Sequence, residues 1–506
     1  MLLPTMVCGR EKRQSTCKSF MLILQSSGKV CNFALMGLTD FPYTLHILLI
    51  LALVLFTHFW GKFLPAQTFF ARKVLHIGAI SCVAHATGIT RVEYQEIFEW
   101  IVLGAALILS LAVYLGFFNT DNRKSWGIAF FPWVLWVMLV SVPLAQYEHI
   151  SFAFWILAWA DGFSAIVGRL WGKAILWRGK TLVGTVTFMV VSLWLCWLMP
   201  IVPKPWFPME VAGILMFALS IAMVEVLGDN GTDNIWIPIW AFIWSLNIEM
   251  FTQLMASTNG FYFYLIAVFG LSYWVWKHKW LDISGLFSAL LLFLTLFIAR
   301  IDWVPLVLFF VLGSLASKLN KTQASDVKHG KARDVFQVLA NAGPIWLLAI
   351  LALFWNLDGT DLFVLSVMSA ALSDTLSSEF GIRWGDRPFS IVTGKPIPVG
   401  VSGGVTWIGF GGAILGALLM ALFGFIFRNI TVMDTVFIVV LGVLGSVLDS
   451  FLGYWLQEKA EFNGEWTDIV SPKDTVVKGV KGVNNDTINA LTLFIISVVS
   501  ALICFY

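Results

Sequence analysis

Long apolar stretches separated by short polar connectors run along most of the chain. The stretches 45–60, 101–118, 211–227, 286–299 and 436–452 are long enough, or nearly so, to cross a bilayer core as helices. With a helix of about 20 residues as the unit, roughly 13–16 spans fit into the sequence. The pattern predicts an all-α, polytopic integral membrane protein.

The composition excludes an ordinary soluble protein. Of the 506 residues, 59% are hydrophobic and 12% are charged, whereas about a quarter of the residues in a typical soluble domain are charged. The net charge of +2 provides no basic field for nucleic acid. The expected partners are membrane lipids and a lipid substrate, and the sequence leaves protein partners open.

Lysine and arginine collect in a few polar connectors, for example 169–180, 318–333 and 473–481. By the positive-inside rule, these loops face the cytoplasm or its organellar equivalent. We therefore expect the active loops on that side of a bacterial inner membrane or a plastid membrane.

The chain divides into two membrane halves, 41–255 and 261–506, with a short turn-rich join between them. Residues 1–36 form an N-terminal extension that is basic and nearly free of acid. This extension is either a leader or an over-long start with Met36 as the true initiator, and the modest content of serine and arginine slightly favours the second interpretation.

An aspartate followed seven residues later by a glycine occurs once in each half, at Asp161 and Asp374, and a glycine-flanked lysine follows at Lys180 and Lys395. Carboxylates inside membranes are costly, so such residues are functional-site hypotheses by default. A basic residue precedes each aspartate, with His76 four residues after Arg72 and Gln337 four residues after Arg333. The spacing places each pair on one helix face, and the shared order indicates two related sites.

The loop around Lys180 has the ingredients of a phosphate site. Its glycines allow close backbone approach to phosphate oxygens, and the lysine supplies charge. The loop lacks the spacing of a Walker A motif, and a positive-inside loop with turn glycines explains it equally well. Mg²⁺ in phosphoryl-transfer sites takes one or two carboxylates plus phosphates and waters.

Carboxylates that could hold such a cation interrupt or flank the apolar stretches of both halves: Asp161, Glu225, Asp233, Asp374, Asp449 and Asp486. Asp161 could instead be an acid at a helix N-terminus, and Asp233 could belong to an ordinary turn. The functional interpretation is favoured for Asp161 and Glu225, which interrupt apolar runs.

The two sites differ at one position that matters for acid–base chemistry. His76 can act as a base for an alcohol proton, whereas Gln337 cannot. This difference suits an alcohol acceptor in the first half and an already anionic phosphate acceptor in the second.

With these residues in place, the first half resembles the phytol kinase and dolichol kinase group of polyprenol kinases. The matching stretches are 72–78, 160–169, 172–185 and 225–238. The second half is similar to the membrane family that includes the plant phytyl-phosphate kinases, over stretches 281–285, 330–342, 373–379, 393–405, 449–457 and 484–489. One departure is Val401-Ser402, where that family shows a more polar run, so a binding role of these two positions is in doubt.

The resemblance implies a fused two-step enzyme that converts an isoprenoid alcohol, expected to be phytol, to its monophosphate and then its diphosphate. CTP or another nucleoside triphosphate and Mg²⁺ would be required, and the product would feed tocopherol, phylloquinone or chlorophyll synthesis. The implied catalytic residues are Asp161, His76 and Asp374. The implied nucleotide- and phosphate-binding residues are Arg72, Lys73, Arg169, Lys173, Lys180, Thr181, Gly184, Arg333, Lys395, Gly403 and Gly404. The implied metal ligands are Asp161, Glu225, Asp233, Asp374, Asp449 and Asp486.

Two other functions fit parts of the pattern. A phosphatidate cytidylyltransferase shares the glycine and lysine content, but its contiguous signature is missing from this sequence. A secondary transporter with two repeats would also explain the spans and the acids. Transporter acids lie at mid-helix beside broken helices, whereas most acids here fall near the ends of the expected spans.

Overall fold

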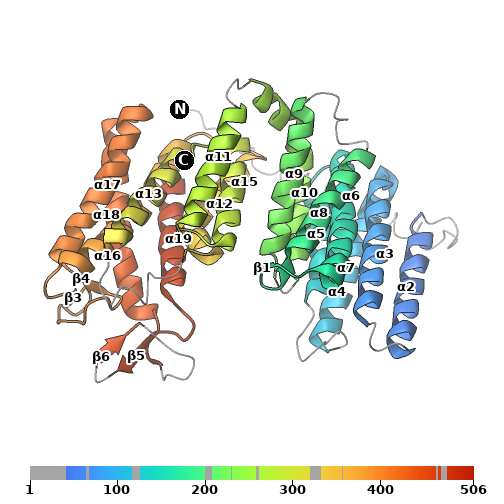
Figure 1. Ribbon diagram of the computed structural model, residues 1–506, viewed down its shortest axis with the longest axis horizontal. Helices are drawn as coiled ribbons and strands as arrows, with labels where there is room; N and C mark the ends of the chain where they lie inside the picture. Colours follow the sequence, from blue (N-terminus) through green and yellow to red (C-terminus); the bar gives the residue numbers. More distant parts are fainter. Residues whose placement is uncertain are drawn as a thin grey trace, which may run out of the picture.

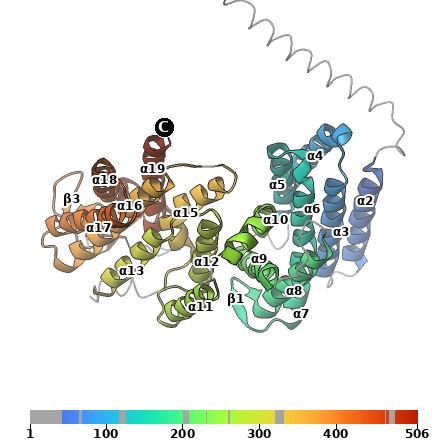
Figure 2. The same ribbon diagram turned by 90° about the horizontal axis from the view of Figure 1, so that it is seen from above.

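The computed structural model describes residues 42–63, 68–116, 126–199, 208–229, 231–257, 261–319, 332–355, 357–462, 465–468 and 476–505. Within these residues the protein is almost entirely helical and forms two bundles side by side, with α2–α10 in one and α11–α19 in the other (Figure 1). The view from above shows α9 and α10 of the first bundle beside α12 of the second (Figure 2). The predicted extension 1–36 and residues 258–260 of the predicted join lie outside the described residues.

The first bundle contains, in chain order, α2 (Thr44–Phe63), α3 (Thr68–Gly88), η2 (Val92–Tyr94), α4 (Gln95–Tyr114), α5 (Gly127–Ser141), η3 (Leu144–Gln146), α6 (Tyr147–Ile156), η4 (Leu157–Asp161), α7 (Gly162–Trp171), β1 (Ile175–Trp177), β2 (Lys180–Thr181), α8 (Leu182–Leu198), α9 (Pro208–Leu227) and α10 (Asp233–Ser257).

The second bundle contains α11 (Phe261–Lys277), α12 (Ile283–Ile298), α13 (Val304–Leu319), α15 (Val335–Ala352), α16 (Thr360–Trp384), β3 (Phe389–Ser390), β4 (Gly404–Val405), α17 (Trp407–Phe427), α18 (Val432–Leu456), β5 (Lys459–Phe462), β6 (Glu465–Thr467), β7 (Val476–Lys478) and α19 (Asn485–Cys504). The strands form two antiparallel hairpins, β1–β2 and β3–β4, and a three-stranded sheet in the order β6-β5-β7. Figure 1 shows them at the same end of the helices.

The predicted class of all-α integral membrane protein is confirmed. Among the described residues, six helical segments are long and apolar enough to cross a membrane, and six shorter apolar helices accompany them. Large apolar side chains cover the outside, as on α4, where Trp100 is 71% exposed and Ile108 is 67% exposed. Such a surface suits contact with lipid, because the bilayer core offers no water to solvate polar groups.

Each bundle has a buried apolar core, and the first core crosses the boundary between the halves. Phe152, Ile156 and Trp244 lie at the centre of the first bundle, and Leu291 and Leu294 of α12 join the same cluster. The two halves therefore share packed surface.

One local arrangement recurs after each predicted aspartate: a glycine at the end of a helix packs against the threonine that caps the next helix. We call it the glycine–threonine joint; it consists of Gly172 and Thr181 in the first half and of Gly385 and Thr406 in the second. Thr181 caps α8 by accepting a hydrogen bond from the Gly184 amide, and Thr406 caps α17 in the same way from the Gly409 amide. Gly172 packs against Thr181, and Gly385 packs against Thr406 with the same partners in register. From the aspartate helix onward, the two halves therefore follow one plan.

The beginning of the two halves does not follow that plan. α3, which carries Lys73 and His76, packs along α6, η4 and α7. α15, which carries Gln337, packs mainly on α12 and α19 and less on the aspartate helix α16. The expected equivalence of these two helices is therefore wrong in its packing, because a shared spacing of two residues does not determine which neighbour a helix contacts.

Candidate functional site

The first polar cluster surrounds Asp161, which lies in the π-helical turn η4 between α6 and α7. Such turns are rare and frequently occur at functional sites. Asp161 is 3% exposed, and its Oδ2 accepts a hydrogen bond of 2.9 Å from the Lys73 ammonium. Lys73 and Asp161 are 88 residues apart in sequence, so the pairing depends on α3 packing against this turn.

His76 contacts two acceptors through one nitrogen. Its Nε2 lies 3.1 Å from the Leu157 carbonyl oxygen and 3.2 Å from Asp161 Oδ2. Because both partners only accept hydrogen bonds, Nε2 carries a proton. If His76 acts as the predicted base, the proton must therefore go to Nδ1.

Close packing of α3 on α7 makes these contacts possible. A Cβ on Gly162 would collide with the side chain of Ile77 on α3. The glycine next to Asp161 thus lets α3 approach near enough for Lys73 and His76 to reach the carboxylate.

The second part of this cluster is organised by Lys180. Its ammonium lies 2.7 Å from Glu225 Oε1 and 3.3 Å from Asp233 Oδ2. Burial alone would lower the pKa of Lys180, but the nearby charges of Glu225 and Asp233 outweigh it and hold the pKa above its usual value. Glu225 is 3% exposed, and its Oε2 has no hydrogen-bond partner among the described residues.

Other predicted residues of the first half lie outside this cluster. Arg72, Arg169 and Lys173 are exposed, and the Arg169 guanidinium stacks over the Phe69 ring at 4.2 Å. Thr181 and Gly184 serve as the cap of α8, which fixes the position of the neighbouring Lys180. The roles predicted for these residues remain predictions.

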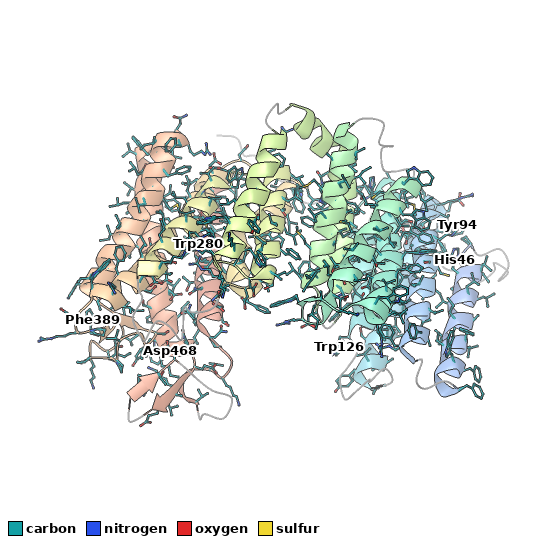
Figure 3. The ribbon with its side chains drawn as sticks, viewed as in Figure 1. His46, Tyr94, Trp126, Trp280, Phe389 and Asp468 are labelled. Carbon is teal, nitrogen blue, oxygen red and sulfur yellow. The ribbon has the colours of Figure 1, made fainter. Side chains whose placement is uncertain are left out.

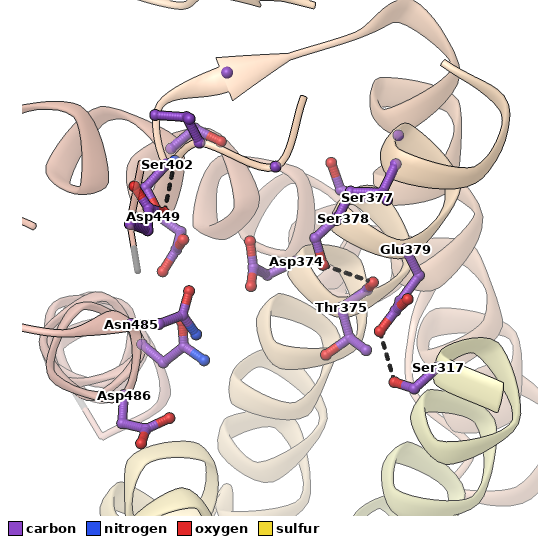
Figure 4. Close-up of a pocket in the computed structure, with 18 of the residues that line it drawn as sticks. Ser317, Asp374, Thr375, Ser377, Ser378, Glu379, Ser402, Asp449, Asn485 and Asp486 are labelled. Carbon is purple, nitrogen blue, oxygen red and sulfur yellow. Dashed lines mark hydrogen bonds between the residues drawn. The ribbon is translucent and has the colours of Figure 1, made fainter. Parts of the chain in front are cut away.

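The second half contains a cavity of about 510 Å³ beneath its hairpin loops. Its lining includes Asp374 from α16, Asp449 from α18, and Asn485 and Asp486 from α19. Figure 4 shows the side chains of Asp374, Asp449 and Asn485 converging on one space. The three acids that the sequence predicted for this half therefore line the same cavity.

The two central carboxylates of the cavity, Asp449 and Asp374, differ in their hydrogen bonds. Asp449 Oδ1 accepts a hydrogen bond of 3.2 Å from the Thr492 hydroxyl and one of 3.1 Å from the Asn489 amide, oriented with its nitrogen toward the acid. Asp374 forms no hydrogen bond or ion pair within the described part of the chain. Asp374 lies ten residues before the end of α16, well inside the helix.

Cationic side chains lie elsewhere in the cavity wall. Lys279, Lys318 and Arg333 all contribute to the lining. Burial lowers the pKa of Arg333 from its usual value, and the negative charge of Glu379 partly compensates. An arginine remains charged despite such a shift, so the cavity combines cations and carboxylates.

The loop between β3 and β4 supplies backbone to the cavity. Gly400, Gly403 and Gly404 line it, and the first two have φ values of 81° and 88°, which favour glycine. The Ser402 Oγ lies 2.6 Å from Asp468 Oδ2 and 2.8 Å from Gln457 Oε1, and its one proton is donated to one of these acceptors. A position whose binding role was in doubt from the sequence therefore belongs to the wall of the cavity. Lys395 is exposed at the tip of the loop and is not part of the lining.

The described residues contain no group of three or more histidine, cysteine, aspartate or glutamate side chains arranged to hold a metal. This does not conflict with Mg²⁺, which usually binds one or two carboxylates and completes its shell with phosphates and waters. The predicted metal ligands therefore remain predictions.

Sequence reasoning missed several residues of the cavity. Trp280 and Asp468, both labelled in Figure 3, line it, as do Ser314, Ser317 and Pro388. The sequence held a signal for Asp468, which is an acid within the polar stretch after α18. It held none for Trp280, because a tryptophan at this position is typical of any membrane interface. Only the packing of α13 beside α16 brings Ser317 within 2.6 Å of Glu379.

Comparisons with known proteins define the family. The family described as "Integral membrane protein DUF92" matches residues 266–497. Over 217 residues, the chain is 34% identical to the "Uncharacterized membrane protein MJ0933" of Methanocaldococcus jannaschii, and the match covers 41% of this chain and 86% of that protein. This chain belongs to the integral membrane protein DUF92 family.

Two plant proteins are also similar to this DUF92 member. "Protein PGR" of Arabidopsis thaliana is 27% identical over 264 residues, covering 46% of this chain and 91% of that protein. "Protein VTE6, chloroplastic" of the same plant is 24% identical over 205 residues, covering 38% of this chain and 56% of that protein. No solved structure matches the chain significantly.

The DUF92 match contains the whole second cavity and all three of its acids. The match begins at residue 266 and so does not include the first half. None of these matches shows the expected likeness of the first half to phytol and dolichol kinases. The predicted multi-pass membrane location is confirmed. One relative, "Protein VTE6, chloroplastic", is named for the chloroplast. The side of the membrane on which the loops lie stays a prediction.

Proposed function

We propose that this DUF92 protein is a membrane-bound kinase of isoprenoid lipids. In this proposal the second half phosphorylates a prenyl monophosphate to the diphosphate, and the first half phosphorylates the alcohol. The similarity to "Protein VTE6, chloroplastic" and the resemblance of residues 281–489 to the plant phytyl-phosphate kinase family support a function in prenyl-lipid metabolism.

The observation that carries the proposal is the mixed charge of the second cavity. Phosphoryl transfer between two anionic phosphates needs cations for their oxygens and carboxylates for a metal ion. Lys279, Lys318 and Arg333 are placed to bind phosphate oxygens, while Asp374 and Asp449 offer carboxylate oxygens in the same cavity. The glycine loop around Gly403 offers backbone at the wall.

Mg²⁺ is the cation that this chemistry implies, and the residues fit it. Asp374 and Asp449 would hold the ion, since both carboxylates line the cavity and the described residues provide no ammonium or guanidinium partner for them. When bound, the ion would neutralise charge on the transferring phosphoryl group. CTP or another nucleoside triphosphate remains the proposed donor.

The two steps make different demands on the protein. In the first, the alcohol oxygen attacks the terminal phosphorus of the donor, the bond to the bridging oxygen breaks, and the hydroxyl proton goes to a base, for which His76 Nδ1 is the candidate. In the second, an oxygen of the monophosphate attacks in the same way. No base is needed there, because the nucleophile is already ionised, which agrees with the neutral Gln337 in the second cavity.

The test is transfer of label from γ-labelled CTP to phytol and to phytyl phosphate by membranes that contain the protein. We expect wild type to label both acceptors, Asp374→Asn to lose labelling of phytyl phosphate, and Asp161→Asn to lose labelling of phytol. Asp434→Asn is the control, because Asp434 caps the opposite end of the helix that carries Asp449. Absence of label in both acceptors with wild type and all triphosphates would refute the kinase.

A transporter with two repeats is the alternative that the same preparation tests. Asp161 at a π-helical turn inside a long span resembles the broken helices of carriers. Uptake of labelled prenol or prenyl phosphate into vesicles without covalent conversion would favour the carrier. Conversion without vectorial uptake would favour the kinase.

A further inference from the structure

The two polar sites differ in whether a cationic side chain neutralises the negative charge of their carboxylates. In the first half, Lys73 lies 2.9 Å from Asp161, and Lys180 lies 2.7 Å from Glu225 and 3.3 Å from Asp233. In the second half, among the described residues, no basic nitrogen lies within 4.0 Å of a carboxylate oxygen of Asp374, Asp449 or Asp486.

The glycine–threonine joint allows the two halves to be compared position by position, and this comparison explains why the second half has no counterpart of Lys180. Lys180 stands immediately before the cap Thr181, in strand β2, and Val405 stands immediately before the cap Thr406, in strand β4. The position that supplies an ammonium group to the first site is therefore apolar in the second. Among the described residues, no lysine or arginine pairs with Asp374 as Lys73 pairs with Asp161, and α15 presents the neutral amides Gln337 and Asn341 to the cavity.

We infer that the divalent cation needed by the proposed kinase binds in the second half alone, held by Asp374 and Asp449, and that Lys73 and Lys180 take its place in the first half. This inference rests on the proposed function for the identity of the cation. It divides the predicted metal ligands into two groups and removes Asp161, Glu225 and Asp233 from the metal set.

Electrostatics supports this division. A divalent ion entering the first site would have to displace two ammonium groups from carboxylates that they already neutralise, so it would gain less there than beside carboxylates that carry no cation. In the second site the ion would cancel the charge of two carboxylates that have no cationic partner among the described residues. Thr492 and Asn489 both contact Asp449 Oδ1, so this carboxylate is held in place while its other oxygen stays available.

The buried oxygen of Glu225 agrees with a site that binds no metal. Its Oε2 is the acceptor left over in the first cluster once Lys180 holds Oε1. Mg²⁺ usually binds one or two carboxylates that carry no other cation, whereas Asp161 and Asp233 beside this oxygen are each paired with an ammonium group. The oxygen therefore suits a single hydroxyl donor. An alcohol hydroxyl is the ligand that the proposed first step would bring there.

Iron-directed cleavage can locate the cation without any assay of activity. Fe²⁺ replaces Mg²⁺ in the full chain in detergent, and ascorbate with peroxide then generates radicals that cut the backbone next to the ion. We expect cuts near Asp374 and Asp449, suppressed by excess Mg²⁺, and none near Asp161 or Glu225. Mass spectrometry of the fragments reads the positions.

Three variants sharpen the result. Asp374→Asn should abolish the cuts, and Lys180→Met should create new ones near Glu225 and Asp233, since it frees two carboxylates. Arg91→Met, which replaces an exposed arginine of the same half that has no predicted role, should change nothing. If Lys180→Met fails to fold, the wild-type pattern and Asp374→Asn still decide.

Cuts near Asp161 or Glu225 in wild type, absence of cuts near Asp374, or a pattern that Asp374→Asn leaves unchanged would overturn the inference. Its failure is distinct from failure of the proposed function. A chain that labels both acceptors but cuts in the first half keeps the kinase and loses the division of cations. A chain that cuts only in the second half but labels neither acceptor keeps the cation site and loses the kinase.

Discussion

At the scale of single residues, the ion pair between Lys73 and Asp161 connects α3 to the aspartate turn. Asp161 is nearly inaccessible, with its side chain 4% exposed, while Lys73 retains 21% exposure. The two partners are therefore unequal: a lysine that loses its partner can turn toward water, but a buried carboxylate cannot.

We expect Lys73→Met to lower the free energy of unfolding by about 3–5 kcal/mol, because it leaves the buried charge of Asp161 without its ammonium partner. Asp161→Asn should cost less, and adding Asp161→Asn to Lys73→Met should restore much of the loss. Unfolding in detergent measures all three, with Lys173→Met as a control expected to stay within about 0.5 kcal/mol of wild type. Equal losses for Lys73→Met and Lys173→Met would contradict the assignment.

Substitution of the carboxylates of the second cavity, which have no cationic partner among the described residues, should affect stability in the opposite way. We expect Asp374→Asn and Asp449→Asn to leave stability unchanged or to raise it, since each removes a half-buried charge that lacks an ionic partner among the described residues. Asp302→Asn provides the contrast, because Asp302 Oδ2 accepts a hydrogen bond of 2.6 Å from Arg428 Nε. Its loss should cost on the order of 1.5 kcal/mol. A large destabilisation by Asp374→Asn would show that this residue has a structural role.

At the scale of elements, the joint made by a glycine and a capping threonine is the part of the repeat that sequence and structure share most closely. Gly172 and Gly385 each end an aspartate helix, and each lies against the threonine that begins the next helix. What was visible in the sequence was a different glycine, seven residues after each aspartate, at Gly168 and Gly381. The contact with the threonine was not, because a hairpin of variable length intervenes.

We expect Gly172→Ala and Gly385→Ala to destabilise the protein by similar amounts, about 1–3 kcal/mol each. A Cβ at either position would collide with the carbonyl four residues earlier and with the threonine side chain. Gly411→Ala is the matched control on α17, where a Cβ meets nothing within 4 Å, and it should be neutral or stabilising because alanine favours helix. Thermal unfolding of the three variants side by side makes the comparison.

At the scale of the whole molecule, the chain combines a DUF92 half with a second membrane bundle. Nearly all of the archaeal relative corresponds to 41% of this chain, so that relative has the size of one half. The halves are nevertheless packed together, because α12 of the second half contacts α9 and α10 of the first.

A chain divided between α10 and α11 and expressed as two pieces should therefore copurify from detergent. Leu291→Ala should weaken this association, since Leu291 is buried in the first core. Leu296→Ala is the control: it removes an equally buried leucine of α12, but one that belongs to the second core. Pieces that separate completely, or equal effects of the two variants, would contradict a packed interface between the halves.

The sequence by itself determined the class of the protein and indicated the central carboxylates of both polar clusters. Apolar runs of this length must form membrane helices, since no other backbone conformation satisfies its hydrogen bonds in lipid. Acids inside such runs are conspicuous for the same reason, and this is why Asp161, Asp374 and Asp449 could be identified. The glycine spacing indicated the repeat, but the four-residue spacing of Arg72 and His76 and of Arg333 and Gln337 wrongly made α15 the counterpart of α3.

Only the tertiary structure decided which charges meet. Lys73 reaches Asp161 across 88 residues and Lys180 reaches Glu225 across 45, and both contacts depend on how the helices rotate and pack. Within the described part of the chain, the same packing leaves Asp374 and Asp449 without a cationic partner, although the sequence has a lysine in the loop of each half. Ion pairing follows distances of a few ångströms, which residue order does not determine, and so two sites that look equivalent in sequence differ in charge balance.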